Sequence, residues 1–136
     1  MIAAKTLLDT DTLSAVMRNK PVVMKRANVY RTTHSQFSFS LMTRFEMLRG
    51  MKARGASAQL AVFEHMCQVH EVLPITESII VRAADIYADL HRRGELIPDA
   101  DLIIGATAIE YGCVLATNNV RHFGRITGLV IDNWLA

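Results

Sequence analysis

The sequence predicts a three-layer α/β/α domain around a mostly parallel central sheet of four to five strands. Short apolar runs alternate with longer segments of helical periodicity along the chain. The run Cys113–Ala116 is wholly apolar, which is typical of a strand covered on both faces. Hydrophobic residues make up 51% of the chain, enough for an ordinary core, so we expect residues 1–136 to form a single domain.

The first elements are a strand and two helices. Thr6–Leu8 is an apolar run that ends at Asp9 and predicts the first strand. Asp11 or Thr12 is expected to cap the helix that follows, with Asp11 the better candidate. A second helix should begin at Pro21, because proline fits the first helical turn. Its expected buried face consists of Val23, Ala27 and Tyr30.

The middle of the chain repeats the order of strand and helix. Residues 36–40 alternate polar with aromatic side chains and predict a strand, whereas residues 41–54 are strong helix formers. A further helix is expected over residues 58–67, and residues 69–75 should form the third strand.

Two helices and a strand complete the prediction. Thr76 is placed to cap a long amphipathic helix that ends near Gly94. The helix from Pro98 to Tyr111 is apolar or small almost all round, which predicts deep burial. Residues 129–131 are expected to form a fifth strand.

The charge is unevenly distributed along the chain. Residues 1–54 carry a net charge of +7 and the remainder −5, although the total is only +2, so the first part suits a polyanionic partner. The N-terminal apolar stretch is interrupted at Asp9 and Asp11, which argues against a secretory signal, and no apolar run is long enough to span a membrane. Cys67 and Cys113 are isolated thiols, so we expect a cytoplasmic protein without a disulfide.

Acids and amides follow the predicted strands. In open parallel sheets the ligand lies outside the carboxyl ends of the strands. Asp9, Glu46, Asp101 and Thr117–Asn119 all belong to segments expected at that edge. Each also has an ordinary interpretation: Asp9 as a turn or cap, Glu46 as a surface partner of Arg49, Asp101 as a charge on the helix dipole, and the asparagines as a turn.

Their coincidence favours a cation site. Two carboxylates about 5 Å apart at an effective dielectric of about 20 repel each other by about 3 kcal/mol, and a divalent ion removes that cost. Oxygen ligands without His or Cys fit Mg²⁺, with Mn²⁺ as an alternative. The sequence has no GxSxG and no GxGxxG motif, so serine hydrolases and dinucleotide-binding enzymes are not indicated.

Four segments in order resemble the successive motifs of PIN-domain ribonucleases, and their spacing is most similar to the VapC toxins of VapBC toxin-antitoxin systems. The segments are Thr6–Ser14 (TLLDTDTLS), Thr43–Gly50 (TRFEMLRG), Ile97–Ala108 (IPDADLIIGATA) and Thr117–Phe123 (TNNVRHF). The resemblance extends over nearly the whole chain and implies a PIN-like fold.

The resemblance also implies the roles of the site residues. Asp9, Glu46 and Asp101 match the family's acidic metal ligands, with Glu46 acting directly or through water. Asn119 stands where the family often has aspartate, which lowers the charge of the site by one. Thr117, Asp99 and Asp11 are the expected supporting neighbours.

The implied activity is Mg²⁺-dependent hydrolysis of RNA phosphodiesters, which leaves a 5′-phosphate and a 3′-hydroxyl and inhibits translation. The expected RNA contacts are Arg44, Arg49, Lys52 and Arg54, whose alternative is a solvated helix face. The implied partners are a second copy of the chain and a VapB-like antitoxin, whose groove would involve the helices beginning near Asp11, Pro21 and Leu41. A PIN-like RNA-binding or scaffold module with impaired catalysis is the alternative, supported by Asn119.

Overall fold

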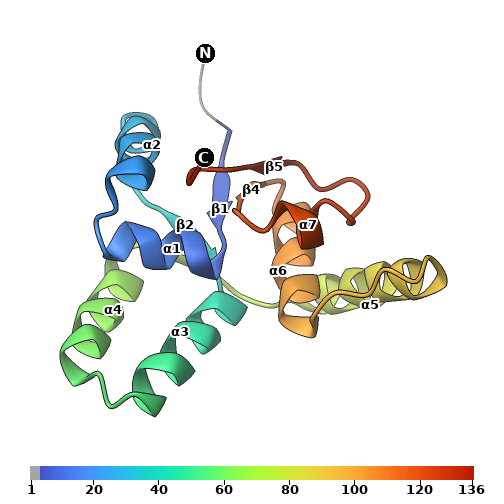
Figure 1. The fold of residues 1–136 in the computed structure, drawn as a ribbon, viewed down its shortest axis with the longest axis horizontal. Helices are drawn as coiled ribbons and strands as arrows, with labels where there is room; N and C mark the ends of the chain where they lie inside the picture. The colour runs from blue at the N-terminus through green and yellow to red at the C-terminus, as the bar shows by residue number, and fades with distance from the viewer. Residues whose placement is uncertain (1–3) are drawn as a thin grey trace.

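A computed structural model describes residues 4–136, so residues 1–3 of the predicted domain lie outside the described residues. Within these described residues, five short strands are interspersed with seven helices (Figure 1). The strands are β1 (Thr6–Leu8), β2 (Ser38–Ser40), β3 (Glu71–Leu73), β4 (Val114–Ala116) and β5 (Ile131–Asp132). The helices are α1 (Thr10–Met17), α2 (Pro21–Arg31), α3 (Leu41–Ala53), α4 (Ser57–Val69), α5 (Glu77–Arg92), α6 (Asp99–Glu110) and α7 (Val120–Phe123).

The five strands form one parallel sheet in the order β3-β2-β1-β4-β5, which confirms the predicted α/β fold. Strand β1 is central and pairs with β2 on one side and β4 on the other. The chain builds the sheet outward from β1 in one direction and then returns to the other side, so the strand order reverses next to β1. Such a switch point opens a crevice at the carboxyl ends of the strands.

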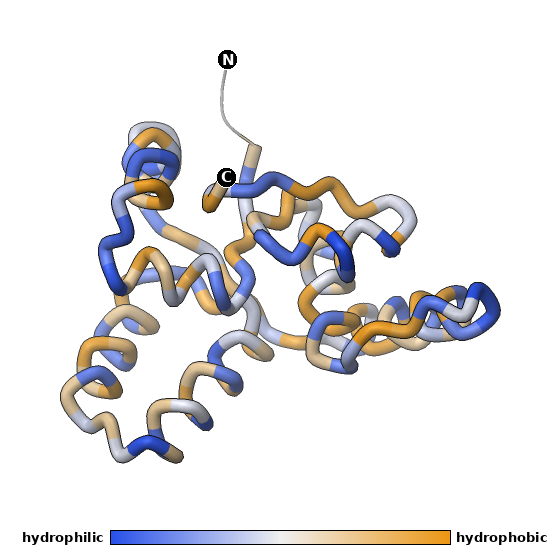
Figure 2. Tube along the Cα trace, in the orientation of Figure 1, coloured by the Kyte–Doolittle hydropathy of each residue, from blue (hydrophilic) through white to orange (hydrophobic). Residues whose placement is uncertain are grey.

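Helices cover both faces of the sheet, because successive side chains of β1 point in opposite directions. Leu7 is fully buried in a core formed with α5 and α6, whereas Leu8 is fully buried in a second core formed with α1 to α4. Figure 1 shows these two groups of helices on opposite sides of the strands. In Figure 2 the outer helices alternate between hydrophobic and hydrophilic residues, as expected for elements with one buried face.

Three predicted features of the helices are confirmed. The hydroxyl of Thr76 accepts a hydrogen bond from the Ile79 backbone N–H and caps α5. Helix α6 is deeply packed, as predicted, since six of its twelve residues are buried: Leu102, Ile104, Gly105, Ala106, Thr107 and Ala108. Helix α2 buries the predicted face of Val23, Ala27 and Tyr30.

Several details differ from the sequence-based expectation. Strands β2 and β3 are shorter than the predicted segments 36–40 and 69–75. Asp9, and neither Asp11 nor Thr12, caps α1, because the helix begins directly after β1 without an intervening loop. The short helix α7 was not predicted, since four residues are too few for a periodic pattern. Strand β5 comprises Ile131–Asp132 and so begins two residues later than predicted.

Among residues 4–136, no helix combines the length and the apolar character needed to cross a membrane.

Candidate active site

Asp9 lies at the switch point, where β1 ends and α1 begins. Its backbone N–H donates to the carbonyl of Ala116 at 3.0 Å and so continues the ladder between β1 and β4. Its Oδ1 accepts a hydrogen bond of 2.8 Å from the Thr12 N–H, which satisfies one of the free donors at the start of the helix. Hydrogen bonds therefore hold both the backbone and the side chain of Asp9, and together they fix the position of its carboxylate.

The Asp9 carboxylate is buried, with only 4% of the residue exposed. Burial raises the pKa of Asp9, while hydrogen bonds from Thr117 and Thr12 oppose that rise. No lysine or arginine among the described residues compensates its charge by an ion pair. A buried carboxylate without a cation is unfavourable, so this position favours a bound positive ion.

Glu46 reaches the same region from α3. Its Oε1 accepts a hydrogen bond of 2.7 Å from the hydroxyl of Thr10, the residue after Asp9, and the same hydroxyl lies 3.1 Å from that of Thr43. Its Oε2 is 3.6 Å from Arg49 Nη2, as the surface interpretation of Glu46 expected. The side chain is only 20% exposed, so Glu46 is held at the inner side of the helix next to α1.

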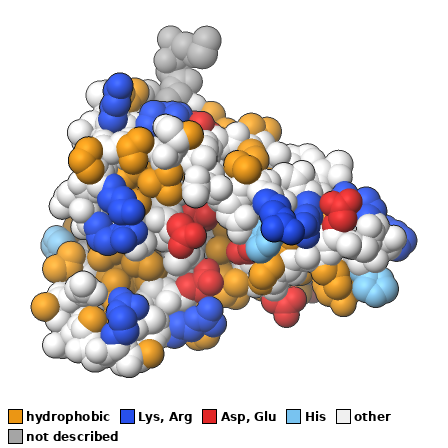
Figure 3. Space-filling model, viewed as in Figure 1, with side chains coloured by type: hydrophobic (Ala, Val, Ile, Leu, Met, Phe, Trp, Pro, Cys, Tyr) orange, Lys and Arg blue, Asp and Glu red, His pale blue; other side chains and the backbone are white. Residues whose placement is uncertain are grey.

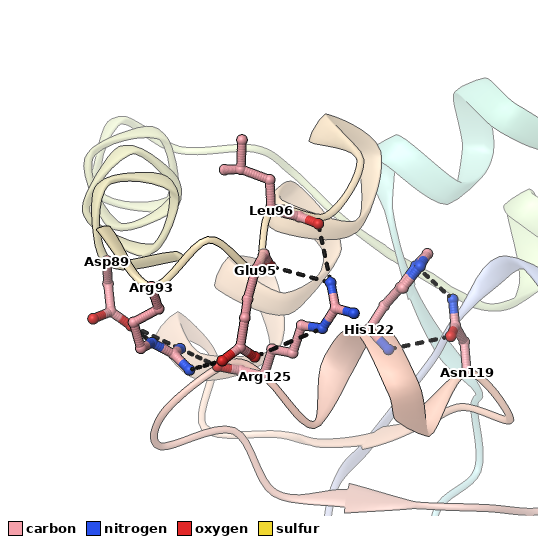
Figure 4. Close-up of polar contacts among 7 residues, drawn as sticks. All are labelled: Asp89, Arg93, Glu95, Leu96, Asn119, His122 and Arg125. Carbon is pink, nitrogen blue, oxygen red and sulfur yellow. Dashed lines mark hydrogen bonds and ion pairs between the residues drawn. The ribbon is translucent and has the colours of Figure 1, made fainter. Parts of the chain in front are cut away.

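Asp101 and Asn119 meet through His122. Asp101 lies in the first turn of α6, and its Oδ2 is 2.9 Å from His122 Nδ1. The Nδ2 of Asn119 lies 2.9 Å from the same nitrogen, while its Oδ1 caps α7 (Figure 4). A single Nδ1 serves one partner at a time, because it donates to Asp101 when it carries the proton and accepts from Asn119 when it does not.

Thr117 connects this group to Asp9. Its hydroxyl accepts a hydrogen bond of 2.9 Å from the Asn119 backbone N–H and stabilises the charged form of Asp9. The residue is fully buried. A continuous series of contacts therefore leads from Asp9 through Thr117, Asn119 and His122 to Asp101.

The predicted supporting acids lie outside this series. Asp99 is exposed at the start of α6, and no hydrogen bond or ion pair joins it to the other site residues among residues 4–136. Asp11 is exposed in the first turn of α1 and lines a groove that also includes Glu46.

The four predicted RNA contacts on α3 separate into different environments. Arg44 forms an ion pair with Glu64 and lies 3.2 Å from the sulfur of Cys67, on the side of α3 that faces α4. Arg49 lies 5.1 Å from the ring centre of Phe45 as well as beside Glu46. Lys52 and Arg54 are exposed, and Arg54 lines the groove that contains Glu46. Figure 3 shows basic side chains around the acidic ones on one face of the molecule.

The groove has a volume of about 690 Å³ and lies between α1, α3 and α4. Its lining includes the apolar side chains Met47, Met51 and Val62 next to Glu46 and Arg54. The helix that begins at Pro21 does not line it, and α4 takes the place expected for that helix.

The oxygen donors of Asp9, Glu46, Asp101 and Asn119 fit a magnesium ion chemically. Among residues 4–136, no three His, Cys, Asp or Glu side chains are close enough to form a ready metal cage. Magnesium is commonly held by one or two carboxylates together with several waters, so a closed cage is not required. The uncompensated charge of buried Asp9 is the observation that supports such an ion.

His122 and Thr10 were not identified from the sequence. Thr10 directly follows Asp9 and precedes the helix start predicted at Asp11 or Thr12, so no role was assigned to it, although its hydroxyl is the link to Glu46. His122 is three residues after Asn119, the spacing at which a residue near a helix start meets one a turn later. That spacing was the available signal for His122.

Comparison with known proteins identifies the class to which this fold and site belong. A family model described as PIN domain matches residues 6–129. The chain is 31% identical over 131 residues to the tRNA(fMet)-specific endonuclease VapC of Salmonella typhimurium, which is 96% of this chain and 98% of that protein. Ribonuclease VapC1 of Methanocaldococcus jannaschii is 37% identical over 89 residues, which is 65% of this chain and 63% of that protein.

Solved VapBC structures show the same similarity. The structure of DNA-bound VapBC from Salmonella typhimurium has a TM-score of 0.84 at 32% identity, over 97% of this chain and 99% of that chain. The structure of VapBC-1 from nontypeable Haemophilus influenzae has a TM-score of 0.80 at 26% identity, over 96% and 98% of the two chains. The chain therefore belongs to the PIN-domain family. Within that family, the relatives that it resembles are VapC ribonucleases.

Proposed function

We propose that the protein is a Mg²⁺-dependent endoribonuclease and the toxin of a toxin-antitoxin pair, which hydrolyses RNA phosphodiesters and thereby inhibits translation. The connected arrangement of Asp9, Asp101 and Asn119 at the switch point, with Glu46 beside it, carries the proposal. The similarity to VapC ribonucleases over nearly the full chain supports it. Cleavage of cellular RNA would take place in the cytoplasm.

The residues that would hold the ion are Asp9 and Asp101, with Glu46 binding directly or through water. A magnesium ion bound there would make an attacking water more acidic and neutralise charge on the phosphate oxygens. Asp9 contributes a carboxylate whose position is fixed by the α1 cap. His122 lies between Asp101 and Asn119, and its Nδ1 bonds to one or the other of them according to whether it carries the proton.

Glu46 and its neighbours would position the substrate side of the site. Thr10 orients the Glu46 carboxylate through the hydrogen bond of 2.7 Å. Arg49 is bound to Glu46 only loosely, at 3.6 Å, and its side chain is 60% exposed, so its guanidinium can contact an RNA phosphate. The positive charge of residues 1–54 would attract the RNA backbone.

An apolar segment of an antitoxin is the proposed occupant of the groove between α1, α3 and α4. The groove combines methionines and an exposed valine with Glu46 and Arg54, so a bound peptide would cover both the apolar surface and the site. The VapBC structures to which the chain is similar support a partner of this kind.

A homodimer is proposed as the second association. Ile80 and Tyr87 lie seven residues apart on α5 and are 46% and 44% exposed, so they share one apolar face of a helix that packs mainly on α6. Sedimentation of the purified protein should give twice the mass of the chain, and Tyr87→Lys should shift it toward the monomer.

The direct test is RNA cleavage by purified protein freed of any antitoxin. Transfer RNA is the first substrate to use, because the Salmonella relative is named for tRNA(fMet). Cleavage should require Mg²⁺, stop with EDTA and be lost in Asp101→Asn. Asp99→Asn is the matched control, since it makes the same change two residues away in the same helical turn and should retain activity. Unchanged cleavage by Asp101→Asn would overturn the assignment.

An RNA-binding or scaffold domain with impaired catalysis is the alternative. Asn119 in the fourth position and the lack of three clustered ligands among residues 4–136 favour it. The same assay separates the two proposals, because a scaffold would bind RNA equally well with EDTA and leave it intact.

A further inference from the structure

Two segments that carry site residues are tied together at a distance from the acids themselves. The first segment is the connection between α5 and α6, which leads into the helical turn that carries Asp101. The second segment follows α7, the short helix that contains His122. Arg125 Nη1 donates to the carbonyls of Glu95 and Leu96, at 3.2 and 3.1 Å. In return, Arg93 Nη2 donates to the carbonyl of Arg125 at 2.6 Å. The hydrogen bonds therefore run in both directions between two stretches of backbone.

The carboxylate of Glu95 lies between the two guanidinium groups (Figure 4). Its oxygens are 3.5 Å from Arg93 Nη1 and 3.8 Å from Arg125 Nε, and Arg93 is further held by Asp89 at 2.9 Å. A single exposed ion pair contributes little to stability. Here several contacts share the same groups, and the planar guanidinium of arginine bonds in fixed directions, so the arrangement determines geometry more than stability.

Close packing also joins the residues around α7 to α6, the helix that carries Asp101. Gly105 of α6 faces Ile126 so closely that an added Cβ would lie 2.6 Å from Ile126 Cδ1. Phe123 and Ile126 are almost fully buried against α6. Residues 120–126 therefore pack closely on α6, and the contacts of Arg93 and Arg125 fix the orientation of this segment.

We propose that Arg93, Glu95 and Arg125 form a clamp that positions Asp101 against Asn119 and His122. These three are positioning residues, because none of them touches the acids directly. One turn of chain separates Arg125 from His122, whose Nδ1 is 2.9 Å from Asp101. The existence of the clamp is independent of the proposed nuclease, whereas its effect on ion binding depends on the proposed metal centre.

The test compares Arg125→Gln with Arg92→Gln. Arg92 is exposed next to Arg93 and forms no ion pair within residues 4–136, so it provides the same chemical change outside the clamp. Amide hydrogen exchange of residues 95–101 and 119–125 should be about tenfold faster in Arg125→Gln and unchanged in Arg92→Gln. The dissociation constant for Mn²⁺, measured by electron paramagnetic resonance, should rise about tenfold only in Arg125→Gln. Arg93→Gln should produce the same two changes to a smaller extent, and it serves if Arg125→Gln does not fold.

Unchanged amide hydrogen exchange in both Arg125→Gln and Arg93→Gln would show that no clamp exists. Faster exchange with an unchanged Mn²⁺ dissociation constant would refute the positioning role. A wild-type protein that binds no Mn²⁺ would refute the proposed metal centre, and the positioning of ligands with it, while the exchange comparison would still decide whether the two segments are clamped.

Discussion

Asp9 has two roles that a pair of substitutions separates: it caps α1 and contributes a buried charge to the site. Asparagine caps helices about as well as aspartate, so Asp9→Asn should keep the hydrogen bond to the Thr12 N–H and lose only the charge. Asp9→Ala loses both. Removal of a cap costs about 1 kcal/mol, with a range of about 0.5–2, and the Thr12 N–H left without a partner adds to this cost because it is buried.

The expected stabilities follow from the direction of the pKa shift. Because the folded-state pKa of Asp9 is raised, its ionisation removes stability as the pH rises through that pKa. Metal-free Asp9→Asn should therefore be at least as stable as the metal-free wild type near neutral pH. Asp9→Ala should be about 1–2 kcal/mol less stable than Asp9→Asn, which is about 4–8 °C in melting temperature for a domain of this size.

Thermal unfolding with and without Mg²⁺ provides the assay. At about a hundred times its dissociation constant, the ion should stabilise the wild type by about 2.7 kcal/mol. Neither variant should show that gain. The reasoning would be refuted if metal-free Asp9→Asn were clearly less stable than the wild type, or if Mg²⁺ stabilised the variant as strongly as the wild type.

Three further predictions concern other parts of the molecule. Burial, and secondarily the charge of Arg31, lowers the pKa of His70, whose Nδ1 accepts a hydrogen bond of 3.0 Å from the Phe37 N–H. The contribution of neutral His70 to stability should therefore be lost as the pH falls below about 6.5. Denaturant titrations between about pH 7 and pH 5.5 should show this loss in the wild type and a smaller one in His70→Asn. In the groove, Val62→Glu should weaken antitoxin binding about tenfold or more in calorimetry, whereas Val69→Glu on the same helix outside the groove should not, and equal weakening by both would contradict the proposed docking face. For RNA, Arg49→Gln should lower the slope of log affinity against log salt by about 1, whereas Arg44→Gln should change it less because Glu64 already neutralises that side chain. Equal slopes for the two arginine variants would show that the ion pair does not matter for RNA contact.

The strand and helix order could be predicted because each signal is local. The alternation of polar and aromatic residues before Leu41, the cap at Thr76 and the apolar helix after Pro98 depend only on neighbours in the sequence. Parallel strands separated by helices then require that Asp9 and Asn119 emerge at the same edge.

The contacts that organise the site depend on tertiary approach and were less accessible. His122 meets Asp101 only because α7 packs closely on α6 at Gly105, and no sequence spacing encodes that distance. The cap of α1 was assigned wrongly to Asp11, because the sequence does not show that the strand passes into the helix at Asp9 without a loop. The groove was predicted to involve α2 but is lined by α4 instead. The positions of these helices depend on how all of them pack together in the core, which the sequence of one helix does not show.

The chemical identity of the RNA ends after cleavage tests the central claim most directly. Hydrolysis by a water activated at a magnesium site held by Asp9 and Asp101 predicts a 5′-phosphate and a 3′-hydroxyl, formed only in the presence of Mg²⁺. Products that end in a 2′,3′-cyclic phosphate would mean that the RNA 2′-hydroxyl attacks in place of water, and cleavage that persists in EDTA would mean that no metal ion is required. Either result would contradict the account.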